Sequence, residues 1–120
     1  MRFIYGALCL IFIVYSLRTV MALNSSFQVE EAKKEIAAGA LLIDVRTPAE
    51  YLDGHAVGSI NIPYDELGDR VEELEAYREK SVVVYCRSGQ RSGKGKQTLE
   101  NLGFDKVINA GGLKEMQSIA

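Results

Sequence analysis

The sequence predicts an α/β fold, a three-layer sandwich in which helices cover both faces of a central parallel sheet. Strand-like and helix-like segments alternate along most of the 120-residue chain, and this order is typical of parallel sheets. The clearest strand, SVVVY at 81–85, is a short, unbroken apolar run of the kind found in strands that are buried on both faces. The length suits one domain of ordinary size.

Before this central strand, capping residues and apolar spacing indicate five elements. Thr47-Pro48-Ala49-Glu50 is a capping box with proline at the first helical position, which predicts the start of a short helix. Leu67, Val71 and Leu74 recur at helical spacing between acidic residues, as on a surface helix. The expected elements are, in order, a helix from Ser25 or Ser26 to Gly39, a strand at 40–44, a helix from Thr47 to about Gly54, a strand at 59–63 and a helix from Leu67 to about Arg78.

The same alternation continues after the central strand. The expected elements are a loop, a helix from about Ser92 to Leu102 that Gly103 would end, a strand at 106–109, the pair Gly111-Gly112 and a short terminal helix. Glycines at 93 and 95 lower the helix propensity of the segment from about Ser92 to Leu102, and we expect them to loosen the support behind the preceding loop.

The first 22 residues have the layout of a secretory signal peptide. A positively charged start is followed by an uncharged apolar run at 3–17, and Ala22 is the small residue after which signal peptidase would cut. The rival interpretation is an uncleaved membrane anchor, because the extended run approaches one bilayer crossing, although Arg18 inside the extension weakens it. We expect a signal peptide at 1–22, a folded domain at 23–120 and export to the periplasm. The alternative is a membrane-anchored domain outside the cytoplasm.

Composition excludes several classes of function. The chain carries 14 Lys and Arg against 16 Asp and Glu, and this net charge of -2 gives no reason to expect nucleic-acid binding. Two cysteines, Cys9 and Cys86, and one histidine, His55, are too few for a disulfide-stapled scaffold or a His-rich metal site. Removal of the signal segment with its two arginines leaves 12 basic and 16 acidic residues, a net charge of -4. Cys86 is then the only thiol, and it is a buried hydrophobic residue, an intermolecular partner or a reactive group.

Cys86 follows the central strand directly, at the edge where open parallel sheets bind their ligands. Gly89 allows a tight turn, so successive backbone amides can point inward at a helix N-terminus and form a cradle for an anion. The helix dipole and the guanidinium groups of Arg87 and Arg91 should lower the thiol pKa and favour the thiolate. The candidate site consists of Cys86 as nucleophile and of Arg87, Ser88, Gly89, Gln90, Arg91 and Ser92 around the substrate anion.

Other charged residues near this edge have structural interpretations. His55 lies in a Gly-His turn, where a hydrogen-bonded structural histidine is favoured over a general base. Asp44 and Arg46 favour a buried or half-buried ion pair that shapes the sheet edge. Lys94 and Lys96 favour a solvated helix face that also adds to the positive potential around the thiol.

The loop after Cys86 also has features in common with the anion-binding loops of cysteine phosphatases and of nucleotide-binding proteins. Cysteine phosphatases use C-x5-R, whereas Arg91 closes C-x4-R here, and the smaller ring suits a sulfur atom better than a phosphoryl group. A nucleotide-binding P-loop has a different glycine spacing, and it has Ser or Thr after its lysine where this chain has Gly95 after Lys94. Both alternatives are therefore disfavoured.

Two separated motifs together resemble the single-domain rhodanese family. The family's cysteine loop is matched by CRSGQR at 86–91, and its upstream signature and late glycine pair are matched by Asp44-Val45-Arg46, Pro48, Glu50, Gly54-His55, Gly58, Asn61-Ile62-Pro63 and Gly111-Gly112. One departure is Met116, which stands where many members have tryptophan.

This resemblance has implications for both fold and activity. It implies a sheet of about five parallel strands, and sulfur transfer through a persulfide on Cys86 without a metal or organic cofactor. The partners would be a small anionic donor such as thiosulfate and a thiophilic acceptor such as cyanide or a thiol, and the default oligomeric state is a monomer. The alternative is a persulfide carrier or interaction module that has the fold but little turnover.

Overall fold

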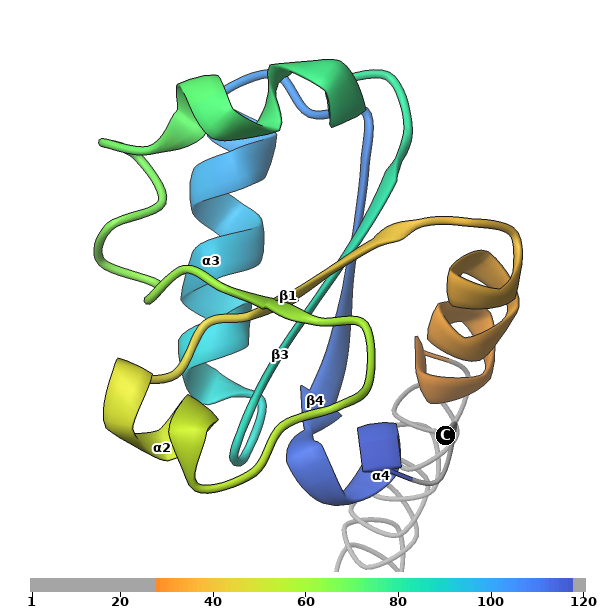
Figure 1. Cartoon of the computed structure of the whole chain (residues 1–120). Helices are drawn as coiled ribbons and strands as arrows, with labels where there is room; N and C mark the ends of the chain where they lie inside the picture. The colour runs from red at the N-terminus through yellow and green to blue at the C-terminus, as the bar shows by residue number, and fades with distance from the viewer. Residues whose placement is uncertain (1–27, 118–120) are drawn as a thin grey trace, which may run out of the picture.

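The computed structural model describes residues 28–117, in which four parallel strands lie between two layers of helices (Figure 1). Residues 28–37 are helical. The other elements are β1 (Leu41–Asp44), α2 (Pro48–Leu52), β2 (Ile60–Asn61), the 3₁₀ helix η1 (Val71–Tyr77), β3 (Ser81–Cys86), α3 (Gln90–Asn101), β4 (Lys106–Gly112) and α4 (Leu113–Gln117). The predicted signal or anchor segment, and the Ser25 or Ser26 cap, lie outside the described residues. Between 28 and 117, none of the helices has the length and apolar character needed to cross a bilayer.

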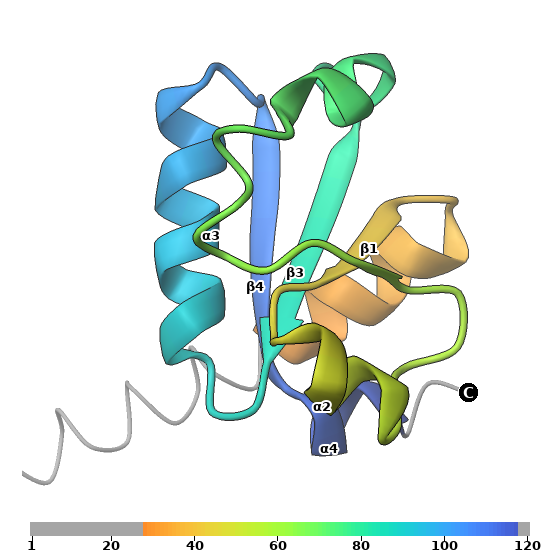
Figure 2. The same cartoon turned by 60° about the vertical axis from the view of Figure 1, so that its left-hand side comes forward.

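The strand order β2-β1-β3-β4 brings three strand ends together. All neighbouring strands are parallel; Asp44 on β1 is opposite Tyr85 on β3, and Cys86 at the end of β3 is opposite Gly112 on β4. The segments that follow β1 and β3 and the last residues of β4 therefore meet at one edge of the sheet (Figure 2). This edge is where ligands bind in open parallel sheets.

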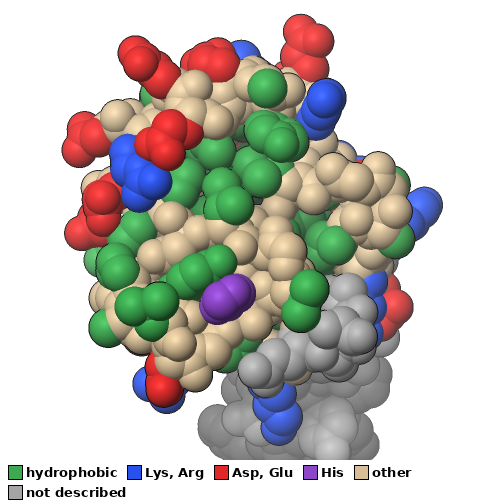
Figure 3. All heavy atoms as spheres, viewed as in Figure 1, with side chains coloured by type: hydrophobic (Ala, Val, Ile, Leu, Met, Phe, Trp, Pro, Cys, Tyr) green, Lys and Arg blue, Asp and Glu red, His purple; other side chains and the backbone are tan. Residues whose placement is uncertain are grey.

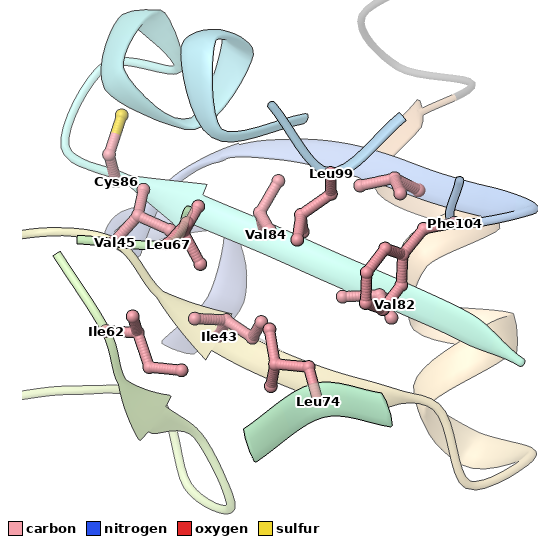
Figure 4. Close-up of a cluster of buried hydrophobic side chains, with 11 residues drawn as sticks. Ile43, Val45, Ile62, Leu67, Leu74, Val82, Val84, Cys86, Leu99 and Phe104 are labelled. Atoms are coloured by element: carbon pink, nitrogen blue, oxygen red, sulfur yellow. The ribbon is translucent and has the colours of Figure 1, made fainter. Parts of the chain in front are cut away.

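Alternation along β3 divides its side chains between two buried clusters. Val82, Val84 and Cys86 face a cluster that is covered by α3 and η1 (Figure 4). Val83 and Tyr85 face the opposite cluster, to which helix 28–37 and α4 contribute. Figures 1 and 2 show α3 and helix 28–37 on opposite sides of the sheet. The two-residue period of a strand thus directs the Cys86 side chain to the side of the sheet that α3 covers.

The predicted strands are all present, and the sheet is confirmed as parallel. The fifth strand, which only the resemblance implied, is not found within residues 28–117. β2 covers only Ile60–Asn61 of the expected 59–63, and Pro63 lies where its missing amide proton would face away from β1, as is usual for proline in an edge strand. Its neighbours Ile62 and Tyr64 still extend the edge by donating to the carbonyls of Asp44 and Val45, at 3.1 and 3.0 Å.

The prediction of an α-helix at 67–78 is wrong in type. The segment forms turns and then the 3₁₀ helix η1. Val71, Leu74 and Tyr77 are spaced by three residues, so the three-residue turn of a 3₁₀ helix aligns them on one side, and all three pack against the first cluster. Acidic side chains remain on the outer surface over this element, as Figure 3 shows.

The glycines of α3 bring the helix close to the sheet. A Cβ atom on the buried Gly95 would lie 3.1 Å from Leu67 Cδ1 and 3.6 Å from Val45 Cγ1, so Leu67 would have to shift to admit a side chain there. Gly95 therefore also has a packing role, which the expectation of a loosened helix did not include. Met116 on α4 is also buried and belongs to the second cluster.

Candidate active site

Cys86 is the last residue of β3, and its thiol lies under the loop that leads into α3. Its Sγ accepts a hydrogen bond from the Gly89 amide at 3.0 Å and lies 3.3 Å from the Ser92 hydroxyl oxygen. In Figure 4 the sulfur points toward this loop and the start of the helix. The residue has 0% exposed surface. Cys86 thus combines the burial of a core residue with polar contacts that a purely apolar core site would lack.

The loop lowers the pKa of this thiol against the effect of burial. Burial is the largest single influence and would raise the pKa of Cys86, because a low-dielectric site disfavours the charged form. The hydroxyl and amide of Ser92 and the amides of Ser88 and Gly89 together outweigh it, and the pKa lies below its usual value. These donors belong to the turn and the first turn of α3, where the helix dipole also favours negative charge. The structure therefore places three of the predicted loop residues against the sulfur.

Gly89 sets the shape of this turn. It takes a positive φ of 93° and forms the N-cap of α3, so the helix starts at Gln90 rather than at the expected Ser92. A Cβ at position 89 would lie 3.3 Å from the Cα of Gly111 on β4, which leaves little room for a side chain. The left-handed backbone and the close approach of β4 both require glycine here.

Arg91 is paired with a carboxylate from another element. Its Nη1 and Nη2 donate to Glu50 Oε1 and Oε2 at 2.6 and 2.9 Å, a bidentate ion pair between α3 and α2. This pairing, with smaller contributions from Thr47, lowers the pKa of Glu50 to about 2. Glu50 also completes the capping box of α2, as the sequence predicted. One carboxylate therefore starts α2 and braces the loop that covers Cys86.

Arg87, Ser88 and Gln90 are exposed at the rim of the loop. Arg87 borders two surface cavities, of about 330 and 280 Å³. The larger is lined in part by Ser88, Gly89 and Asn109, and the smaller also contains Arg46, Glu50 and Lys114. Of the two arginines predicted to hold an anion, Arg87 is therefore at the openings beside the loop, whereas Arg91 is bound to Glu50.

Asn109 is a site residue that the sequence interpretation missed. Its Nδ2 donates to the Gly89 carbonyl at 3.0 Å, and its Oδ1 accepts from the Ser92 hydroxyl at 2.7 Å and from the Gly111 amide at 3.0 Å. The alternation of β4 explains this position, since Asn109 falls on the same face as the buried Val107, under the loop. A polar residue inside an otherwise apolar strand, just before the glycine pair, was the available signal.

The predicted ion pair between Asp44 and Arg46 is confirmed. Arg46 Nη2 lies 2.6 Å from Asp44 Oδ2, and both side chains are almost entirely buried. The Tyr85 hydroxyl donates to the same oxygen at 2.8 Å and accepts from the Ala56 amide at 3.0 Å. The Arg46 Nη2 also donates to the Gly54 carbonyl at 2.7 Å. This network fixes the chain after β1 and so fixes α2, which carries Glu50.

His55 has the structural role that was expected. Its Nδ1 is 2.8 Å from the Tyr51 carbonyl, and its ring stacks on that of Tyr51 with centroids 3.7 Å apart. The histidine lies on the outer surface in Figure 3. Lys94 and Lys96 lie on α3, near the Tyr64 ring and Glu100 respectively. Within residues 28–117, His, Cys, Asp and Glu side chains do not gather into a group of three or more that could hold a metal ion.

Comparison with known sequences identifies the family. The profile of the rhodanese-like domain matches residues 28–118. The chain belongs to the rhodanese-like domain family. It is 42% identical over 74 residues to the thiosulfate sulfurtransferase PspE of Escherichia coli strain K12, which covers 62% of this chain and 71% of that protein. It is 37% identical over 93 residues to the chloroplastic thiosulfate sulfurtransferase 16 of Arabidopsis thaliana, over 69% of this chain and 78% of the relative.

The rhodanese fold is confirmed by solved structures. A rhodanese with anions from E. coli is similar to this chain with a TM-score of 0.61 and 40% sequence identity, over 64% of this chain and 91% of that one. The matched segment of the rhodanese-like domain contains both sequence motifs. Together with the sulfurtransferases among its relatives, this supports a sulfur-transferring enzyme as the general class of activity.

Proposed function

We propose that this rhodanese-like domain is a thiosulfate sulfurtransferase whose nucleophile is Cys86. The observation that carries the proposal is the thiol at the end of β3, whose pKa is lowered by hydrogen bonds from the Ser92 hydroxyl and from the backbone amides of Ser92, Ser88 and Gly89. The thiolate is the form of cysteine that attacks sulfur, and a lowered pKa increases the fraction of thiolate. The relatives named as thiosulfate sulfurtransferases and the rhodanese solved with anions support a small sulfur-containing anion as the substrate.

The reaction proceeds in two transfers of one sulfur atom. The Cys86 thiolate attacks the outer sulfur of thiosulfate, a new S–S bond forms, and sulfite leaves with the electron pair of the broken bond. Cys86 then carries a persulfide. A thiophile such as cyanide attacks the outer sulfur, takes it as thiocyanate and releases the thiolate. Both steps are nucleophilic displacements at sulfur, so the cycle is balanced without an added oxidant or reductant.

The loop residues divide into two roles in this cycle. The backbone amides from Arg87 to Ser92 would stabilise the anionic sulfur and the departing sulfite at the N-terminus of α3, and those of Ser88, Gly89 and Ser92 already contact the thiol. The exposed Arg87 guanidinium attracts the anionic donor at the rim. Arg91, which is paired with Glu50, braces the loop and adds positive potential rather than binding the donor directly.

Access to the sulfur sets a condition on this mechanism. Because Cys86 has 0% exposed surface, the donor can reach Sγ only after the side chain rotates or the 87–89 turn moves. The same burial favours a second candidate function, a low-turnover persulfide carrier that accepts one sulfur and waits for a specific partner. The two candidates differ in stoichiometry: an enzyme turns over with free cyanide, whereas a carrier stops after one sulfur per chain.

The test uses the full-length, uncleaved chain and compares the parent protein with Cys86→Ser and with the control Cys9→Ser. Sulfite release from thiosulfate is measured with and without cyanide, and intact mass is recorded before and after thiosulfate alone. We expect repeated turnover and a gain of one sulfur atom in the parent and in Cys9→Ser, and neither in Cys86→Ser. Sulfite release by Cys86→Ser at the parent's rate would refute the assignment of the nucleophile. A single burst in the parent, without turnover, would favour the carrier.

We also propose export to the periplasm, with the 1–22 segment removed after Ala22. Support comes from the apolar run and its flanking residues in the sequence alone. The same intact mass measurement on protein secreted from a bacterial host tests this proposal. A mass that begins at Leu23 is expected, whereas a full-length mass in the membrane fraction would indicate the anchor.

A further inference from the structure

One hydroxyl proton beneath the loop has two acceptors within reach. The Ser92 hydroxyl oxygen lies 2.7 Å from Asn109 Oδ1 and 3.3 Å from Cys86 Sγ. A serine hydroxyl has a single proton and donates it to one acceptor at a time. Ser92 has 0% exposed surface, so bulk water does not offer a third acceptor. The proton therefore goes either to the amide oxygen or to the sulfur.

The orientation of the Asn109 amide is fixed by its other partners. The Gly111 amide can only donate and faces Oδ1 at 3.0 Å, whereas the Gly89 carbonyl can only accept and faces Nδ2 at 3.0 Å. A flipped amide would lose both hydrogen bonds, so the oxygen is the atom that faces Ser92. Asn109 thus presents a permanent acceptor to the Ser92 hydroxyl.

We infer that Asn109 is a positioning residue that competes with Cys86 Sγ for the proton of the Ser92 hydroxyl, and so controls how readily the thiolate forms. With a neutral thiol, the S–H group donates to the Ser92 oxygen, while the hydroxyl donates to Asn109. After the thiol releases its proton to solvent, the sulfur can only accept, and the hydroxyl rotates toward it. The bond between Ser92 and Asn109 is then broken, while Asn109 keeps the Gly111 amide.

This competition deepens the proposed function, and its importance for turnover rests on that function. In the persulfide, the negative charge lies on the outer sulfur, and Sγ becomes a neutral inner atom. The Ser92 hydroxyl then returns to Asn109, so the two arrangements alternate once in each cycle. Formation of the thiolate can nevertheless be measured without any sulfur donor, which makes the inference testable by itself.

The charged groups around the thiol are the same in the parent and in the neutral variants that test this inference. Arg91 on α3 interacts with Cys86 and with Asp44 on β1, and Arg91 is paired with Glu50 on α2. Arg87 lies in the loop itself. None of these groups changes in the neutral variants below, so their contribution cancels when the titrations of two variants are subtracted.

The test is the pH dependence of Cys86 alkylation by iodoacetamide in the full-length protein. The tryptic peptide at 81–87 contains only this cysteine and is quantified by mass spectrometry. Asn109→Ala removes the competing acceptor, so we expect the midpoint of the alkylation curve to fall by about half to one pH unit. At a pH below the midpoint, this shift corresponds to about three- to tenfold more thiolate. Ser92→Ala removes the donor and should raise the midpoint. Asn101→Ala, an exposed asparagine at the end of α3, is the matched control and should leave it unchanged.

The sign of the shift separates competition from mechanical support. If Asn109 only braced the loop, its loss would weaken the amide contacts to sulfur and raise the midpoint. An unchanged or raised midpoint in Asn109→Ala therefore overturns the inference. In the Ser92→Ala background, Asn109→Ala should no longer lower the midpoint, and a lowering of equal size there would also overturn it. Greater access to a loosened site would increase the rate at every pH without moving the midpoint.

A second substitution covers the case in which the alanine variant does not fold. Asn109→Asp keeps the size of the side chain and adds a stronger, anionic acceptor. It should raise the midpoint by more in the presence of Ser92 than in Ser92→Ala, where only its charge acts. Equal shifts in the two backgrounds would refute competition. Failure of the sulfurtransferase assays would leave these midpoints unaffected, so the two proposals fail separately.

Discussion

The ion pair between Glu50 and Arg91 gives a prediction whose size follows from the structure. Glu50→Gln removes the charge but keeps an oxygen that can accept from the Thr47 amide, and glutamine serves as well as glutamate in a capping box. The substitution therefore tests the ion pair without removing the cap of α2. The two N–O distances of 2.6 and 2.9 Å and the side-chain exposures of 29% for Arg91 and 27% for Glu50 describe a partly exposed, bidentate pair.

The lowered pKa of Glu50 sets an upper limit for the energy. A change from 4.5 to about 2 corresponds to about 3–4 kcal/mol at about 1.4 kcal/mol per pKa unit. Solvent screening of a partly exposed pair reduces this, and we expect Glu50→Gln to lower the free energy of unfolding by about 1–2 kcal/mol at neutral pH. Because the folded-state pKa lies below the unfolded value, the stabilisation is present above about pH 4.5 and is lost as the pH falls toward about 2.

The assay is urea denaturation at several pH values. It compares the parent with Glu50→Gln, Arg91→Gln and the double variant. The double-mutant cycle isolates the coupling between the two side chains. We expect the difference between the parent and Glu50→Gln to shrink steadily from about pH 5 to about pH 2.5. A difference that stayed constant over this range, or a coupling below about 0.3 kcal/mol at pH 7, would show that the pair is worth no more than an ordinary surface contact.

Three further substitutions test the packing around the site. Gly93→Ala should raise the free energy of unfolding by about 0.5–1 kcal/mol, because a Cβ there would meet only Asn109 Nδ2 at an ordinary 3.5 Å; a lower melting temperature would contradict this. Tyr85→Phe should lower the free energy of unfolding by about 2–3 kcal/mol, because the buried Ala56 amide loses its acceptor and Asp44 loses a donor. Equal urea midpoints for the parent and Tyr85→Phe would be inconsistent with that network. Gly89→Ala should destabilise the chain by about 1–3 kcal/mol and raise the Cys86 alkylation midpoint, because φ is positive; unchanged values in both assays would disprove it.

The sheet and the place of the nucleophile were predictable because their signals are local. An unbroken apolar run marked the central strand, and the residue after it falls at the ligand-binding edge of any parallel sheet. Thr47 and Glu50 lie three residues apart, so their capping box could also be recognised in the sequence. Local spacing failed for η1, because Leu67, Val71 and Leu74 match an α-helical period while Val71, Leu74 and Tyr77 match a 3₁₀ period. Packing against the core decided between the two.

The parts of the site that were missed depend on contacts between distant segments. Glu50 and Arg91 are 41 positions apart, and Ser92 and Asn109 are 17 apart. Their meeting depends on the strand order and on the face to which each side chain points, neither of which is encoded in a motif. The sequence could therefore identify Arg91 as a cation near the thiol, but not Glu50 as the carboxylate with which it forms an ion pair. The role of Gly95 was missed for the same reason, since Leu67 and Val45 approach it from other elements.

The groups that surround the thiol come from segments both before and after Cys86 in the sequence. α2, which holds the loop through Glu50, precedes Cys86, whereas Ser92 and Asn109 follow it, and β4 is one of the last elements in the described chain. During synthesis from the N-terminus, Cys86 emerges before the groups that lower its pKa, so the nascent chain carries an ordinary, mostly protonated cysteine. The pKa is lowered only when the turn after β3 and the first turn of α3 have folded around the sulfur. The fold thereby delays the chemistry of the sulfur until the loop that confines it has formed.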